Sequence, residues 1–141
     1  MTDHTTQYPR VVPTLRYRNA GAAITWLAKA FGFEPRLVVP GEGDAVMHAQ
    51  LVADGVMIMV GTARDDAFGQ LQEPPASGGP CTQSPYIIVD DVDAHYARSV
   101  AAEAEIVMEI ADQDYGGRMY SCRDPEGHLW NFGSYDPWVA T

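Results

Sequence analysis

The sequence is poor in lysine and in basic residues generally. Lys29 is the one lysine among nine basic residues, and nineteen acidic residues give a formal net charge of −10. A chain of this charge repels nucleic acid phosphates and anionic lipid headgroups before any specific contact forms, so we expect no nucleic-acid partner. The same charge favours a cationic ligand, although surface acids ordinarily serve solubility.

Cysteines and long hydrophobic runs are also scarce. Cys81 and Cys122 lack CxxC spacing and are too few for a disulfide framework, which fits a reducing compartment. The first ten residues are polar and contain no apolar signal core, and the longest aliphatic run, 56–60, is far too short to cross a bilayer. We therefore expect a cytoplasmic protein with no membrane partner.

What the chain does contain is an internal repeat within a length of 141 residues, the size of one globular domain. The repeat has an offset of 72 residues and predicts no gap. It pairs 13–19 with 85–91, 45–48 with 117–120, and 54–55 with 126–127.

Each copy predicts the same order of elements. An extended stretch ends at a helix-capping residue, Asn19 or Asp91, and apolar residues at helical spacing follow it. Extended segments around 36–39 and 105–109, together with a tight-turn hairpin in each copy, supply three further strands. We therefore predict an α+β fold of two βαβββ modules that form a cupped mixed sheet with the helices outside. The predicted boundaries are a flexible tail at 1–8, a first module at 9–61, a connecting loop at 62–83 and a second module at 84–137, within one domain at 9–137.

The repeat and three short segments resemble a known family. The segments are VDDVD at 89–93, DYGGR at 114–118 and DPEGHLW at 124–130. They resemble the vicinal oxygen chelate superfamily, which holds glyoxalase I, extradiol dioxygenases, fosfomycin-resistance enzymes and bleomycin-resistance proteins. The glyoxalase/bleomycin-resistance-like branch is the most similar. The resemblance implies a homodimer, with modules paired within a chain or exchanged between chains.

The resemblance also implies where a metal ion would lie. In metal-dependent members, the first and last strands of each module each contribute one His, Gln or Glu ligand. The matching positions here hold Val12, Met59, Ser84 and Asn131. Valine offers no lone pair, methionine a soft thioether, and serine and asparagine only weak neutral oxygens. We therefore expect no metal and no other cofactor, which is the pattern of bleomycin-resistance-like binders.

Strand alternation predicts the wall of the cup. If Val12 and Met59 face inward, Arg16 does too, whereas Trp130 turns outward into the core beneath the helices. Methionines on such a wall suit a flat or irregular organic ligand. The predicted ligand-binding residues, including polar contacts at the rim, are Val12, Thr14, Met57, Met59, Ser84, Tyr86, Arg118, Tyr120 and Asn131.

These interpretations favour a metal-free protein that sequesters a small organic molecule, cationic or aromatic, and they assign no catalytic residue. The alternative is a metal-dependent glyoxalase-like lyase, isomerase or dioxygenase with displaced ligands, for which the mid-strand His48 is the candidate. A metal-free enzyme that uses Arg118, Tyr120 or Asp114 for proton transfer is a third interpretation.

Overall fold

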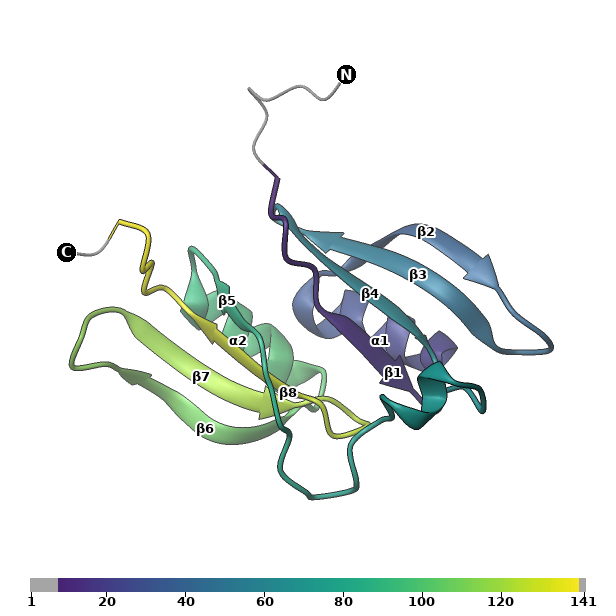
Figure 1. Ribbon diagram of the computed structural model, residues 1–141. Helices are drawn as coiled ribbons and strands as arrows, with labels where there is room; N and C mark the ends of the chain where they lie inside the picture. The colour runs from purple at the N-terminus through teal and green to yellow at the C-terminus, as the bar shows by residue number, and fades with distance from the viewer. Residues whose placement is uncertain (1–7, 140–141) are drawn as a thin grey trace.

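The computed structural model describes residues 8–139, which form two modules with the same order of elements (Figure 1). The first module consists of β1 (Thr14–Tyr17), α1 (Ala20–Phe31), β2 (Glu34–Pro40), β3 (Val46–Ala53) and β4 (Val56–Thr62). The second consists of β5 (Tyr86–Ile88), α2 (Val92–Ala101), β6 (Glu105–Asp112), β7 (Arg118–Arg123) and β8 (Leu129–Gly133). A short 3₁₀ helix, η1 (Phe68–Gln70), lies in the connector. The predicted α+β fold of two βαβββ modules is confirmed; of the predicted tail at 1–8, only Tyr8 lies within the described residues.

The strands form two separate four-stranded mixed sheets, in the orders β1-β4-β3-β2 and β5-β8-β7-β6. In each sheet the first pair is parallel and the other two pairs are antiparallel. The helices lie behind the sheets in Figure 1 and cover one face of each. We call the opposite face of each sheet its helix-free face. Across residues 8–139, no helix is long and apolar enough to span a bilayer.

The sequence signals that predict the helices act as expected. The side chain of Asn19 accepts a 3.1 Å hydrogen bond from the amide of Ala22, and Asp91 accepts one of 3.0 Å from Ala94. Both satisfy an amide that has no partner within its helix. Gly32 ends α1 with φ of 78°, a left-handed conformation that glycine adopts without steric cost.

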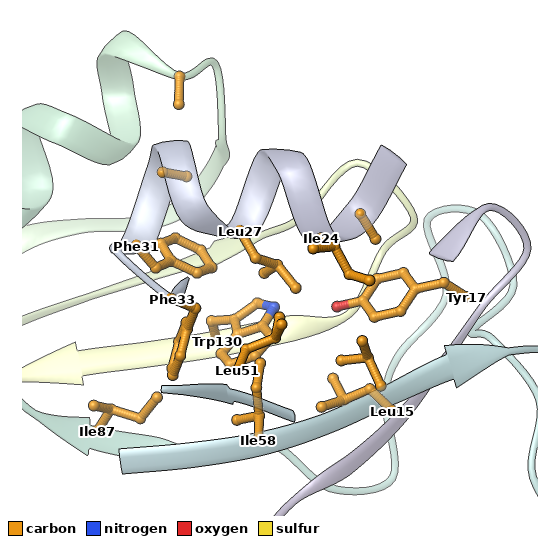
Figure 2. Packing of buried hydrophobic residues seen from close by; sticks show 14 of the residues in the cluster. Leu15, Tyr17, Ile24, Leu27, Phe31, Phe33, Leu51, Ile58, Ile87 and Trp130 are labelled. Atoms are coloured by element: carbon orange, nitrogen blue, oxygen red, sulfur yellow. The ribbon is translucent and has the colours of Figure 1, made fainter. Parts of the chain in front are cut away.

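The two modules share one hydrophobic core (Figure 2). Trp130 of β8 is wholly buried, as predicted, and its ring lies 5.3 Å from that of Phe31 and 6.0 Å from that of Phe33, both in the first module. Leu27 and Leu51 of the first module lie in the same cluster. Burying these large apolar side chains together is the main stabilising contribution to the contact between modules.

Polar groups of the second module bind both ends of α1. The carboxylate of Glu126 accepts hydrogen bonds from the amides of Arg18 (2.6 Å) and Asn19 (2.8 Å), just before the helix begins. The guanidinium of Arg98 donates to the carbonyls of Ala28 (2.9 Å) and Lys29 (2.8 Å), where the helix ends. Negative charge at the N-terminus of a helix and positive charge at its C-terminus both interact favourably with the helix dipole. These contacts fix the orientation of one module on the other.

The two copies of the repeat differ in length by one residue, which the ungapped alignment of the two halves missed. In the first hairpin Val52 pairs with Met57, and in the second Arg123 pairs with Leu129. Met57 and Leu129 are 72 residues apart, since 129 − 57 = 72, but Val52 and Arg123 are only 71 apart, since 123 − 52 = 71. The β7–β8 loop is therefore one residue longer than the β3–β4 turn. A shift of one residue moves every side chain of a strand to the other face, so the ungapped repeat matches His48 of the helix-free face with Tyr120, which is buried on the helix side.

Candidate functional site

The helix-free face of the first sheet brings together most of the residues predicted for that module. Thr14 lies beside Met59, because β1 and β4 are parallel neighbours, and Gln50 of β3 lies on the other side of Met59. Met57 and Met59 are half-buried, and Thr14 is exposed. Val12 precedes β1 and is half-buried. The face thus combines the two methionines with polar side chains such as Thr14 and Gln50.

Asn131 organises the corresponding face of the second sheet. Its amide nitrogen donates to Ser84 Oγ and to the Pro85 carbonyl, both at 2.9 Å, and its oxygen accepts a 2.7 Å bond from Ser121 Oγ. Tyr86 is the strand neighbour of Asn131 and donates its hydroxyl to the Tyr135 carbonyl at 2.7 Å. Both donors of the Asn131 amide are thus used, so it offers a ligand only an acceptor lone pair.

A hollow of about 340 Å³ lies over this second face. Strand β6 and residues of the connector form its sides, and the Asn131–Ser121 pair lies in its wall. Its volume is within the range of small-molecule sites. The lining residues are Pro80, Cys81, Val107, Met108, Ser121, Arg123, Leu129 and Asn131.

Tyr120 does not lie on this face, and its predicted role as a rim contact is wrong. The side chain is wholly buried on the helix side, where its hydroxyl contacts Ser99 Oγ (2.6 Å) and His95 Nδ1 (2.5 Å) of α2. Burial raises the pKa of Tyr120 well above its usual value. Burial, with the nearby charge of Arg98, lowers the pKa of His95 to about 4. The cluster attaches α2 to its sheet and is closed to a ligand.

Arg118 has the same alternation as Tyr120, at the far end of β7. Its guanidinium lies 3.0 Å from Asp112 and 3.3 Å from Asp93, and hydrogen bonding to Asp112 is the main cause of its raised pKa. The guanidinium of Arg118, which was predicted to contact a ligand, is therefore engaged in ion pairs with Asp93 and Asp112. The β7 residues on the hollow are instead Ser121 and Arg123, which the sequence analysis missed. The signal in the sequence that identifies Ser121 and Arg123 is the extra residue in the DPEG loop, because it shifts the alternation of β7 by one position relative to β3.

The residues at the family's metal positions do not fit a metal ion. Val12 has no donor atom, Met59 has a thioether, and the Asn131 amide is held by Ser84 and its neighbours. Divalent ions such as Zn²⁺, Mn²⁺ and Fe²⁺ prefer imidazole or carboxylate ligands. Within the described part of the chain, no group of three or more His, Cys, Asp or Glu side chains could hold an ion. We derive no metal-dependent step for this site.

Two paired βαβββ modules, each with a helix-free face, are the architecture of the vicinal oxygen chelate fold, and the comparisons show the family directly. The chain belongs to the Glyoxalase/Bleomycin resistance protein/Dioxygenase superfamily, whose model matches residues 3–132. This confirms the resemblance to the vicinal oxygen chelate superfamily.

Individual relatives agree with this membership. The uncharacterized protein Mb0911c of Mycobacterium bovis is 32% identical over 125 residues, which cover 89% of this chain and 82% of that protein. The crystal structure of TioX from Micromonospora sp. ML1 is 35% identical with a TM-score of 0.71, covering 89% of this chain and 97% of TioX. The fosfomycin resistance protein FosX of Listeria monocytogenes, solved with Mn(II), has a TM-score of 0.64 over 89% of each chain. At 15% identity, FosX shows the shared fold alone.

Proposed function

We propose that this protein binds and sequesters a small organic molecule without a metal ion, between the helix-free faces of paired modules. The observation that carries the proposal is the chemistry of the family's metal positions. Val12 and Met59 in the first module cannot replace a carboxylate or an imidazole, and the Asn131 amide is already hydrogen-bonded on both donors. Metal-dependent relatives need the ion to polarise substrate oxygens, and these residues offer no substitute for that charge.

The walls favour an apolar or aromatic ligand. Met57 and Met59 present flexible, polarizable thioethers on the first face, and Leu129 lines the hollow on the second. The few polar groups, such as Thr14 and Ser121, are of the kind that orients a ligand within a mainly hydrophobic pocket. None of the residues that line the hollow is acidic, so an aromatic ligand has better support than the cationic ligand that the net charge favours.

We further propose that the protein is a cytoplasmic homodimer in which a second copy contributes to the ligand site. Both cysteines are free, in keeping with a reducing compartment. Exposed apolar side chains lie on the outer strands, with Leu37 and Val38 on β2 each 44% exposed and Met108 on β6 64% exposed. A second copy that covered them would remove apolar surface from water and close an open cup. Sedimentation equilibrium tests this, and a monomer at micromolar concentration contradicts it.

Native mass spectrometry of untagged protein, with elemental analysis of the same sample, tests the binding function. We expect an organic compound bound in molar proportion and no stoichiometric metal. Removing the side chains of the ligand wall in a Met57→Ala/Met59→Ala variant should lower the occupancy of that compound. Met47→Ala is the matched control, because Met47 is 56% exposed and one strand away. Equimolar Zn, Ni, Fe or Mn that dialysis against chelator removes together with the ligand would contradict the proposal.

One observation favours the metal-dependent alternative. His48 and Gln50 lie together on the helix-free face of β3, with His48 Nε2 3.1 Å from Gln50 Nε2, and both residue types are ligands in the metal-dependent relatives. If they bind an ion, adding Zn²⁺ or Mn²⁺ should raise the melting temperature by preferential binding to the folded state. A His48→Ala variant should then lose that rise. An unchanged wild-type melting temperature excludes this alternative.

A further inference from the structure

Arg16 lies on the helix-free face of the first sheet in a place that a glycine opens for it. Arg16 of β1 is the strand neighbour of Gly61 of β4. A Cβ added at Gly61 would collide with Arg16 Nη1 and lie 3.0 Å from the Met47 carbonyl. The guanidinium therefore lies close to the backbone of β4, beside the methionine wall formed by Met57 and Met59, and a larger residue at 61 would displace it.

The connector covers this guanidinium with an aromatic ring. Phe68 of η1 lies with its ring centroid 5.0 Å from the Arg16 guanidinium carbon, and the guanidinium of Arg64 lies 5.5 Å from the same ring. Both distances are within the range of cation–π contacts. Two cations thus meet at one ring in a chain whose net charge is −10.

The charges around this ring are not balanced. Asp66 forms a 2.9 Å ion pair with Arg64 and offsets its charge. Among residues 8–139, Arg16 has no carboxylate within ion-pair distance, and its Nε is buried without a hydrogen-bond partner. Burial, and then the nearby charge of Arg64, lower the pKa of the Arg16 guanidinium from its ordinary value. A buried donor left unpaired is costly, and a bound acceptor removes that cost.

We propose that Arg16, assisted by Arg64 and covered by Phe68, is the anion-binding end of the ligand site, and that the ligand is an aromatic carboxylate. This inference rests on the proposed function and specifies its ligand class. A planar guanidinium fork matches a carboxylate, and the single unmatched positive charge matches one negative charge. Since Thr14 pairs with Met59 and Arg16 with Gly61 along the same strands, a ligand held at Arg16 lays its apolar body along the methionine wall. The proposed ligand is therefore an anion, and not the cation that the net charge of the chain favours.

Paired probes test this inference by isothermal titration calorimetry with the full chain. The probes are 2-naphthoate, 4-biphenylcarboxylate and indole-3-acetate, each compared with its uncharged primary amide. We expect wild-type protein to bind at least one carboxylate roughly 10- to 100-fold more tightly than its amide, the range of a charge-assisted hydrogen bond. Arg16→Gln should abolish this preference, and Arg64→Gln should weaken it. Arg36→Gln, which removes an exposed arginine of β2, is the matched control and should leave it unchanged.

A second variant separates position from charge. Gly61→Ala keeps both arginines but pushes the Arg16 guanidinium off β4, so it should lose the preference for the carboxylate as well. Melting temperatures of all variants establish that they fold. Equal binding of carboxylate and amide, a preference that survives Arg16→Gln, or no binding of any carboxylate each overturns the anion site. The proposed function is tested separately, because a neutral compound that co-purifies with the protein supports sequestration while contradicting the carboxylate.

Discussion

The phenol of Tyr17 in β1 donates a 2.6 Å hydrogen bond to Oδ2 of Asp124, which lies 107 residues later in the loop between β7 and β8. Asp124 is 4% exposed and also accepts from the Trp130 indole (3.1 Å) and from the amides of Glu126 and His128 (3.0 Å each). The aspartate of the DPEG segment therefore joins the first strand of one module to the last strand of the other. Burial, and then the charge of Asp124, hold the pKa of the Tyr17 phenol well above its usual value, so it remains a donor.

Tyr17→Phe should lower the free energy of unfolding by about 1–3 kcal/mol, because it leaves a buried carboxylate oxygen one donor short. Urea denaturation measures the change. Tyr115→Phe is the matched control, since Tyr115 is 57% exposed and its hydroxyl donates to the Met119 sulfur, at 3.3 Å. Its cost should stay within about 0.5 kcal/mol. Equal costs for the two variants would show that the Tyr17–Asp124 bond contributes nothing specific.

Glu126→Ala should destabilise the contact between modules by removing both acceptors from the amides of Arg18 and Asn19. We expect a loss of about 1–2 kcal/mol, comparable to the loss of a helix N-cap. Glu105→Ala is the control, because Glu105 forms a solvent-exposed pair with Arg123 at 3.2 Å and such pairs contribute at most about 1 kcal/mol. Thermal unfolding of both variants measures which of them loses more stability, and a larger loss for Glu105→Ala than for Glu126→Ala would contradict the prediction.

His95 makes stability depend on pH. Its folded-state pKa of about 4 lies below the ordinary value of 6.5, so the unfolded chain binds the proton more readily between these values. The free energy of unfolding that the neutral His95 side chain contributes is fully present above pH 6.5 and is lost as the pH falls towards 4. After allowance for the partial exposure of the ring, we expect a loss of about 2 kcal/mol.

The difference in unfolding free energy between wild type and a His95→Gln variant, measured by urea titration from pH 7 to pH 4, isolates this effect from the carboxylates. Wild type should lose stability more steeply than His95→Gln. Tyr120→Phe is the control: it removes the hydroxyl that contacts His95 but keeps the ring buried, so the steep pH dependence should persist. Parallel curves for wild type and His95→Gln would contradict the assignment.

Local signals were enough to predict the elements of this fold. Asn19 and Asp91 cap the two helices as expected, because a capping side chain acts within three residues of its own position. The inward direction of Met59 follows from alternation in β4, a strand whose mate in the second module is 72 residues away without interruption. Trp130 was correctly placed in the core for the same reason.

The errors arose where the argument depended on a loop or on distant contacts. Tyr120 was expected to contact a ligand at the rim, but the extra residue in the β7–β8 loop sets the register so that Ser121, and not Tyr120, lies beside Asn131 on the helix-free face. The position of Phe68 over Arg16 was not predictable, because the connector has no periodicity and its contacts are set by tertiary packing. The arginine itself was correctly expected to face inward.

Gly61 and Gly133 occupy matching places in β4 and β8, and each is covered by a long side chain from the first strand of its own module. At Gly133 an added Cβ would lie 2.5 Å from the Tyr86 hydroxyl and 3.0 Å from the Arg118 carbonyl, and that backbone cannot move without disrupting the sheet. Gly133→Ala should therefore cost about 1–3 kcal/mol through overpacking. Gly21→Ala in α1 meets nothing nearer than 3.8 Å and should stabilise the protein by about 0.5–1 kcal/mol, because alanine favours the helix. Differential scanning calorimetry should give melting-temperature shifts of opposite sign; a neutral or stabilising Gly133→Ala would mean that Tyr86 can leave this position freely.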